Sequence, residues 1–245
     1  MASLSPLTRF QTRVTQAVHP AWEALLRVIY PPRCVGCGAR LLEDPTPLCH
    51  RCLSRLEQVD ADRLASLLAD LPEAQTVLDG AFALWLFDTD GTVQRLQHLL
   101  KYGNRPAYGH ALGQFIGAAY RDTTAPRPAL VLPVPLHRAR RYERGYNQSA
   151  MLAQGVGQAL GVPVSETRLT RPRATSSQTN LSRLRRWENV AGAFAVTQPE
   201  AVAGRSVLLV DDVLTTGATL AAAALVLKQA GASSVHAATL ALARS

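Results

Sequence analysis

Apolar runs and helical patterns alternate along residues 79–245. Short apolar runs predict strands at residues 80–87, 129–134, 162–167, 206–210 and 234–243. Apolar residues at helical spacing predict helices from residue 93 to about 103 and over residues 107–120, 147–160 and 219–230. Strands that alternate with helices favour an α/β fold, with a mostly parallel sheet covered by helices on both faces. Ligands of such sheets bind at the carboxyl ends of the strands.

The first part of the chain has a different pattern. Apolar residues at helical spacing predict a helix over residues 8–29, and Pro31 and Pro32 end it. No apolar run is as long as the roughly 18 residues of a membrane span, and the N-terminus lacks the apolar core of a secretory signal, so a cytoplasmic location is expected. The chain is therefore divided into an N-terminal helix, a cysteine-rich segment, a linker and an α/β domain, at residues 1–32, 33–57, 58–78 and 79–245.

Two adjacent aspartates, Asp211 and Asp212, stand where an apolar strand ends, in the stretch VLLVDDVLTTGAT at residues 207–219. The alternative interpretation is that an aspartate merely caps the next helix, but capping requires one aspartate at most. The loop after the pair combines hydroxyls, a glycine and a helix N-terminus, whose free N–H groups attract phosphate. The carboxylates repel phosphate but accept hydrogen bonds from a vicinal diol, with a divalent cation nearby to offset their charge. The pattern predicts a ribose 5-phosphate site, and a Walker loop is excluded because GxxxxGK[ST] is absent.

VLLVDDVLTTGAT resembles the 5-phosphoribosyl-1-diphosphate (PRPP) motif of type I phosphoribosyltransferases. The resemblance implies that Asp211 and Asp212 hold the ribose hydroxyls at the catalytic centre. It also implies a magnesium ion bound with the diphosphate. The residues expected to hold the 5-phosphate are Thr215, Thr216, Gly217, Ala218 and Thr219.

The formal net charge is +8, and residues 121–186 contain 12 arginines but only 3 acidic residues. This excess indicates a polyanion site, with a solvated surface as the alternative. PVPLHRARRYERGYNQ (133–148) follows a strand end, so its arginines are predicted to face a diphosphate. The polar segment 171–194 is predicted to be a lid, with a mobile surface loop as the alternative. The diphosphate and lid candidates are Arg138, Arg140, Arg171 and Gln178.

Both segments, as PVPLHxxRxxxRGYNQ and RxxxTxxQxxLSxxxRxxN, resemble the ComF family of phosphoribosyltransferase-like proteins, also described as GntX-like or competence protein ComF homologues. The match extends over most of residues 79–245. It implies a type I phosphoribosyltransferase that transfers phosphoribose from PRPP to a nitrogen nucleophile and releases pyrophosphate. Arg144 joins the two aspartates as a catalytic candidate, and nothing in the sequence identifies the acceptor.

The four cysteines form a CxxC-x11-CxxC pattern of Cys34, Cys37, Cys49 and Cys52. Two such knuckles complete a tetrahedral zinc site, which folds a segment with little apolar bulk. Disulfides are rare in a reducing cytosol, and a thioredoxin-like CxxC normally occurs once. ComF-like proteins often carry an N-terminal zinc ribbon, sometimes described as double. One quartet predicts one structural zinc ion.

A different class of function remains open. ComF-like proteins are linked to natural transformation, and zinc ribbons and arginine-rich loops both occur in nucleic-acid binders. On this hypothesis the ligand is single-stranded DNA or a helicase-like partner in DNA uptake, and the PRPP pocket is a sensor or a relic. The aromatic content of 6% is low for a surface on which bases stack. A regulator that binds PRPP without turnover is a third interpretation, and the oligomeric state is open.

Overall fold

The computed structural model describes residues 31–41, 46–60, 64, 77–89, 91–174, 190 and 192–243. Its elements are α2 (His50–Leu53), β1 (Gly80–Leu86), α5 (Thr92–Tyr102), α6 (Pro106–Arg121), β2 (Leu130–Pro133), α7 (Arg138–Arg144), α8 (Gln148–Leu160), β3 (Leu169–Thr170), β4 (Ala195–Val196), a 3-10 turn (Pro199–Ala201), β5 (Ser206–Leu214), α10 (Ala218–Gln229) and β6 (Ser234–Leu242). The predicted N-terminal helix at residues 8–29 lies outside the described residues.

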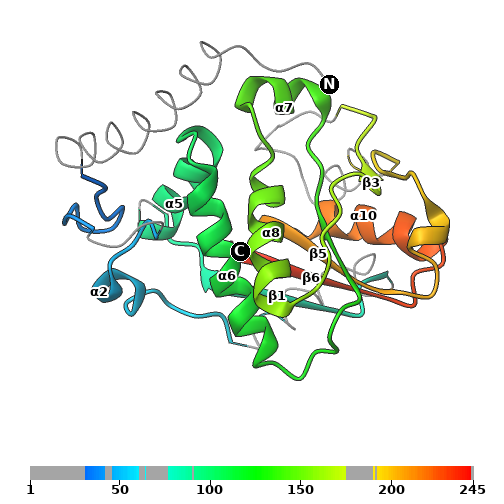
Figure 1. Cartoon of the computed structure of the whole chain (residues 1–245), viewed down its shortest axis with the longest axis horizontal. Helices are drawn as coiled ribbons and strands as arrows, with labels where there is room; N and C mark the ends of the chain where they lie inside the picture. Colours follow the sequence, from blue (N-terminus) through cyan, green and yellow to red (C-terminus); the bar gives the residue numbers. More distant parts are fainter. Residues whose placement is uncertain are drawn as a thin grey trace, which may run out of the picture.

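A parallel sheet with the strand order β1-β6-β5-β2 forms the centre of the α/β domain. Helices α6 and α8 lie over one face of this sheet, and α10 lies over the other (Figure 1). Apolar side chains of β5 point alternately to the two faces. Leu208 and Val210 pack on the side of α5, α6 and α8, whereas Val207 and Leu209 pack on the side of α10. The predicted α/β fold with a mostly parallel sheet is confirmed.

Helices α6 and α8 pack closely because glycines face each other's backbone. A Cβ on Gly113 of α6 would lie 2.0 Å from the Leu152 carbonyl oxygen of α8. A Cβ on Gly155 of α8 would lie 2.0 Å from the His110 carbonyl oxygen of α6. Any larger residue at either position forces the helices apart, so these contacts set the position of α8 above the sheet.

Helix α5 begins where Asp88 binds its first backbone N–H groups. The Asp88 carboxylate accepts hydrogen bonds from the N–H groups of Thr92 and Val93, each at 2.8 Å, and of Gln94 at 3.2 Å. Four orphan N–H groups at a helix start require such partners, and a negative charge there also interacts favourably with the helix dipole. Asp88 therefore fixes the start of α5, and the C-terminal turn of α5 reaches the candidate site.

Two predicted strands differ in the structure. Residues 162–167 form only a single parallel bridge, Val131 with Val164, and the chain then pairs β3 with β4 in an antiparallel ribbon. The predicted strand at 206–210 continues to Leu214, so both aspartates belong to β5. The arginine-rich loop after β2 contains the short helix α7, which hydrophobic periodicity did not predict. No helix in the described part of the chain has the length and apolarity needed to cross a membrane.

Candidate functional site

The two aspartates stand at the carboxyl end of β5 and face different partners. Strand alternation places Asp212 in the row of Leu208 and Val210, on the side of α5, and Asp211 in the opposite row. Asp212 is buried with 7% of its surface exposed, and Asp211 is half-buried. Carboxylates in such positions are costly unless they are paired or hydrogen-bonded, so their partners define the site.

Helix α5 supplies the partners of Asp212. The Lys101 ammonium lies 3.0 Å from Asp212 Oδ2, and Gln97 Nε2 donates to the same oxygen at 3.5 Å. Positions 97 and 101 are four apart, so both side chains project from one face of the helix. The Val213 N–H donates to Asp212 Oδ1 at 3.0 Å. Helix α5 thus holds one carboxylate of the pair in a defined orientation and offsets its charge.

The N-terminal turn of α8 supplies the partner of Asp211. Asn147 caps this helix by accepting from the Ser149 N–H at 3.2 Å, and the Ser149 hydroxyl donates to Asp211 Oδ1 at 2.8 Å. Burial and the neighbouring charge of Asp212 raise the pKa of Asp211 to about 7, although the Ser149 hydroxyl lowers it. Asp211 is therefore the carboxyl group whose protonation changes near neutral pH.

The expected phosphate loop connects β5 to α10. Gly217 has a φ of +73°, which favours glycine, and it is the N-cap of α10 with no side-chain capping hydrogen bond. The first N–H groups of α10 are therefore directed toward the loop without a side-chain cap. Thr215 is exposed, Thr216 and Thr219 are half-buried, and Ala218 is buried. The structure thus places the whole loop beside the carboxylate pair.

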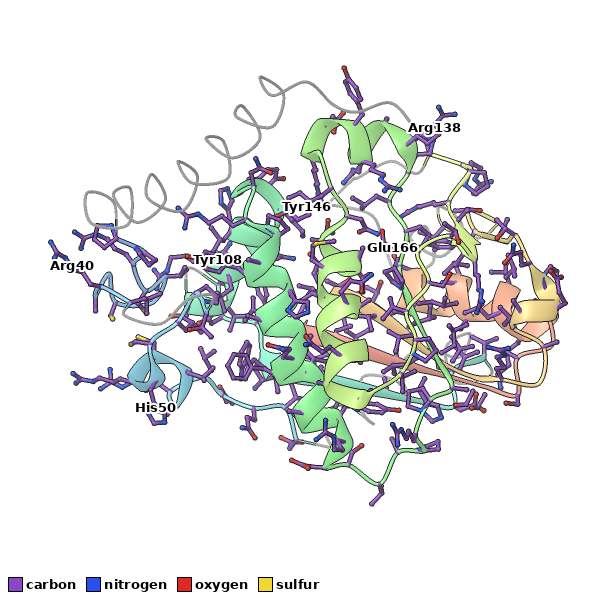
Figure 2. The ribbon with its side chains drawn as sticks, in the orientation of Figure 1. Arg40, His50, Tyr108, Arg138, Tyr146 and Glu166 are labelled. Atoms are coloured by element: carbon purple, nitrogen blue, oxygen red, sulfur yellow. The ribbon has the colours of Figure 1, made fainter. Side chains whose placement is uncertain are left out.

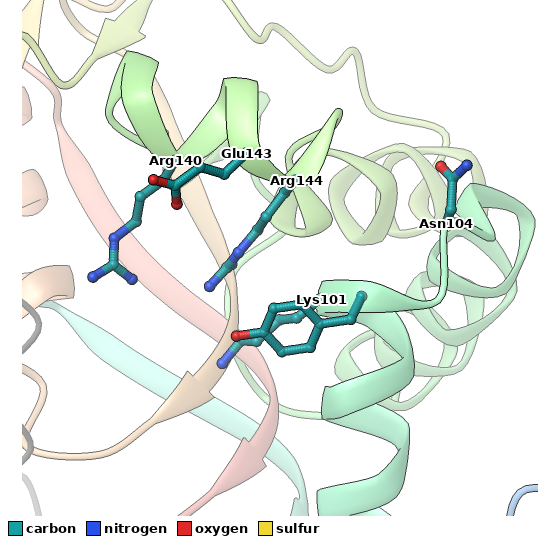
Figure 3. A pocket seen from close by; sticks show the side chains of 6 residues that line it. Lys101, Asn104, Arg140, Glu143 and Arg144 are labelled. Carbon is teal, nitrogen blue, oxygen red and sulfur yellow. The ribbon is translucent and has the colours of Figure 1, made fainter.

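Helix α7 divides the predicted arginines between two faces. Arg140 and Arg144, one helical turn apart, project from α7 over Lys101 and line a cavity of about 360 Å³ (Figure 3). The Arg144 guanidinium also donates to Gln148 Oε1 at 3.0 Å. Arg138 is exposed at the start of α7 and points outward (Figure 2), away from this cavity. Of the four arginines of α7, Arg140 and Arg144 therefore line the cavity, whereas Arg138 and Arg141 do not.

Arg171 follows β3 directly and interacts electrostatically with Asp211. Its guanidinium lies over the Phe194 ring, with Cζ 5.1 Å from the ring centroid. Burial lowers the pKa of Arg171, the charge of Asp211 raises it and the charge of Arg140 lowers it, so these groups are close enough to interact. Gln178 lies outside the described residues.

The four cysteine sulfurs lie within 4.8 Å of one another, and Cys37 Sγ is 3.8 Å from Cys49 Sγ. Tetrahedral zinc with Zn–S bonds of about 2.3 Å places neighbouring sulfurs about 3.8 Å apart, so the cluster fits one zinc ion. Burial raises the pKa of Cys34, but backbone N–H groups, among them that of Cys49, outweigh it and lower the pKa to about 6. Cys34 therefore already favours the thiolate that zinc requires, whereas burial and hydrogen bonds with the other cysteines raise the pKa of Cys52 to about 12.

Three side chains of the site were not predicted from the sequence: Gln97, Lys101 and Ser149. Gln97 and Lys101 occupy the polar positions of an amphipathic helix, where charged residues are ordinary. Ser149 is a small residue two positions after the Asn147 cap. Only their position beside the strand ends in the folded structure identifies them as part of the site.

Two family models match parts of the chain. The phosphoribosyl transferase domain family matches residues 147–245, and the double zinc ribbon domain family matches residues 25–64. The chain contains four cysteines, which provide one complete quartet.

Curated relatives and solved structures were also compared. DNA utilization protein YhgH of Salmonella typhi is 38% identical over 145 residues, which cover 58% of this chain and 63%, under two thirds, of that relative. Competence protein F of Haemophilus influenzae is 30% identical over 209 residues, which cover 83% of this chain and 87% of that protein. A glutamine PRPP amidotransferase structure from B. subtilis matches with a TM-score of 0.39 and 20% identity, over 58% of this chain and 30% of that chain.

Proposed function

Because this chain belongs to the ComF family of phosphoribosyltransferase-like proteins, we propose that it binds PRPP and transfers phosphoribose to a nitrogen nucleophile. The observation that carries this proposal is the geometry at the end of β5. Two carboxylates, each with its own partner, stand beside the loop that leads into α10, whose first N–H groups have no side-chain cap. Carboxylates that accept hydrogen bonds from hydroxyls stand next to N–H groups that donate to a phosphate, and together they match the two ends of a ribose 5-phosphate.

In this proposal each part of PRPP has its own group of residues. Asp211 and Asp212 accept hydrogen bonds from the ribose hydroxyls, and the backbone N–H groups and hydroxyls of residues 215–219 bind the 5-phosphate. Arg140 extends over the same site, and its guanidinium group stabilises the leaving diphosphate, with Arg144 beside it as a catalytic candidate. The further diphosphate and lid candidates are Arg138, Arg171 and Gln178.

The transfer step conserves atoms and electrons. The lone pair of the acceptor nitrogen forms a bond to C1 of the ribose while the C1–O bond to the diphosphate breaks. The electron pair of that bond leaves with pyrophosphate, and an N–H acceptor then loses its proton to solvent. The protein contributes mainly by clamping the phosphate and the diol and by stabilising charge on the leaving group.

The family resemblance implies magnesium in this step. Asp211 and Asp212 offer oxygen ligands of the kind that magnesium prefers, but the ammonium of Lys101 already lies 3.0 Å from Asp212 Oδ2. This donor set suits an ion that is held largely by the oxygens of PRPP, with few ligands from the protein. Bound in this way, magnesium would neutralise charge on the diphosphate.

Calorimetric titration of PRPP with magnesium tests this proposal. We expect saturable, magnesium-dependent binding to the native protein and none to the double variant Asp211→Asn, Asp212→Asn, because amides are poorer acceptors for the diol. Pyrophosphate release in the presence of nitrogenous acceptors then measures turnover. Equal binding to both proteins would contradict the role of the carboxylates, and no binding to either would remove the enzyme proposal.

A second candidate function is binding of single-stranded DNA. The observation that favours it is the outer face of α7, where Arg138 and Arg141 are exposed and Tyr142 is 92% exposed. Exposed arginines beside an exposed ring are the elements of a single-strand binding surface. The names of the relatives, DNA utilization protein and Competence protein F, fit a role in DNA uptake. In this alternative the PRPP pocket is a sensor or a relic.

A further inference from the structure

The cavity between the C-terminal end of α5 and helix α7 has features that PRPP does not explain. Its volume is about 360 Å³, within the range of small-molecule sites. Figure 3 shows the side chains of Arg140, Arg144 and Lys101 directed into the space between the two helices. The residues that line it are Lys101, Tyr102, Asn104, Arg140, Glu143 and Arg144.

Tyr102 provides a flat, accessible surface in this cavity. It is 64% exposed, which is unusual for an aromatic side chain in a folded domain. The His98 ring lies 4.8 Å from it between centroids, and Arg144 Cζ lies 5.7 Å from its centroid. An aromatic ring contributes nothing to the binding of a diphosphate. Aromatic rings with arginine planes beside them bind other planar rings by stacking.

The charge of the cavity selects among planar ligands. Three cations, Lys101, Arg140 and Arg144, line it against one acidic residue, Glu143. Within the described residues, neither Arg140 nor Arg144 forms a salt bridge with a carboxylate, and Arg144 donates a hydrogen bond to the neutral Gln148. Arginines without a carboxylate partner favour an anionic ligand, which accepts paired hydrogen bonds from a guanidinium.

The cavity also adjoins the place where the ribose is expected. Lys101 lines the cavity and contacts Asp212 Oδ2 at 3.0 Å, so a single side chain separates the cavity from the diol acceptors. A planar ligand on Tyr102 is therefore next to the ribose rather than at a remote surface. This adjacency is what an acceptor of the transfer requires, since the reacting atoms have to approach within about 3–3.5 Å.

We propose that this cavity is the acceptor site and that it takes a small aromatic nitrogen heterocycle with a carboxylate group. The ring stacks on Tyr102, and the carboxylate binds Arg144, which lies over that ring, while Arg140 binds the diphosphate. This inference rests on the proposed function, because the acceptor's ring nitrogen would form the new bond to C1 as the diphosphate departs with the electron pair of the broken C1–O bond.

The test compares nicotinate with nicotinamide, which share a ring but differ in charge. Both are titrated into the full chain in the presence of saturating ribose 5-phosphate. We expect nicotinate to bind about tenfold more tightly than nicotinamide, because only the carboxylate forms charge-assisted hydrogen bonds with Arg144. The Tyr102→Leu variant is expected to bind nicotinate about tenfold more weakly, whereas Tyr102→Phe retains the ring and the affinity.

Tyr142→Leu is the matched control, because Tyr142 is also an exposed tyrosine but does not line the cavity. Its affinity for nicotinate should equal that of the native protein. Equal affinities for the two probes, or no effect of Tyr102→Leu, would overturn the inference if ribose 5-phosphate still binds. Nicotinate binding that depends on Tyr102 without any ribose 5-phosphate binding would keep the ligand class and remove the proposed function. Binding of an oligo(dT) strand at Tyr102 with no nicotinate binding would also overturn the inference.

Discussion

Asp211 and Asp212 are neighbours in sequence, but their surroundings differ. Asp212 forms a salt bridge with the Lys101 ammonium, whereas the hydrogen bonds to Asp211 within the described residues come from the neutral Ser149 hydroxyl and the Asp212 N–H group. Burial and the charge of Asp212 therefore raise the pKa of Asp211 to about 7. Asp211 is consequently only partly ionised at neutral pH, although a diol requires it as an acceptor.

This difference predicts a pH-dependent affinity for ribose 5-phosphate. Below about pH 7, Asp211 is protonated and loses part of its capacity to accept hydrogen bonds from a ribose hydroxyl. We expect the association constant to increase as the pH rises through about 7. Titration calorimetry between pH 6 and 8 measures this change, with both limits chosen about one unit from the pKa.

Asp211→Asn is the control, because the ligand's own phosphate also titrates. The pKa of a phosphate monoester is near 6, about one unit below that of Asp211. The variant keeps the contribution of the phosphate and should lose that of Asp211. Stability gives an independent check of the sign. The raised pKa of Asp211 stabilises the protein fully below its unfolded value of 3.8, and this stabilisation disappears as the pH rises through about 7. Identical pH profiles for the two proteins would contradict the assignment.

At the scale of elements, helix α5 connects the zinc ribbon to the carboxylates. Cys34 and Leu48 of the ribbon share one apolar cluster with Val93 and Leu96 of α5. The same helix directs Gln97 and Lys101 toward Asp212. A four-thiolate site leaves no position for substrate, so the ribbon affects the ligand site through the position of this helix.

Zinc removal is therefore expected to weaken ribose 5-phosphate binding as well as to lower the thermal midpoint. Without the metal the ribbon loses much of its folding free energy, and the apolar support of α5 with it. The measurement is calorimetry before and after chelation, with zinc added back to restore affinity. Lys101→Met separates the two effects, because it removes the contact with Asp212 and leaves the ribbon intact. If the zinc-free protein binds as tightly as the native one, the ribbon and the site are independent.

The elements also show what could be predicted from the sequence. Strands and helices with a buried face were predicted to within a few residues, because burial imposes periodicity. Helix α7 has no buried residue, so no periodicity marks it, and its signals are the His137 cap and the left-handed Gly145. The segment at 162–167 forms a single bridge, from Val164 to Val131, instead of the predicted strand. Strand pairing depends on partners far away in the chain, so the local apolar pattern could not predict this.

The candidate site divides in the same way. Asp211, Asp212 and the threonine loop form a local pattern that folding alone does not require, so the sequence was sufficient to select them as candidates. Gln97 lies 115 positions from Asp212 and has the appearance of any polar helix residue. Tyr102 likewise became a candidate only when the fold placed it beside Arg144. Contacts between distant segments are set by tertiary packing, which a single sequence does not display.

For the whole molecule, the net charge is +8, and the arginines that contribute to it lie on two different surfaces of α7. Arg140 and Arg144 face the cavity, whereas Arg138 and Arg141 are exposed on the outer side of α7. The inner pair is positioned for a small anion beside the ribose. The outer pair is accessible to a long polyanion, which attracts counterions and releases them when it binds. Substitutions can therefore separate the two functions.

The double variant Arg138→Glu, Arg141→Glu is expected to weaken binding of an oligo(dT) strand and to leave ribose 5-phosphate binding unchanged. Each phosphate contact to a single strand contributes about −0.7 to the slope of log K against log salt concentration. Removing two contacts should reduce that slope in magnitude by about 1.4, which fluorescence anisotropy at several salt concentrations measures. Arg140→Glu, Arg144→Glu makes the same change of charge on the inner face. This variant should instead abolish binding of PRPP and nicotinate. If both variants lose DNA binding and ribose 5-phosphate binding together, one shared surface binds both ligands and the division of α7 into two faces is wrong.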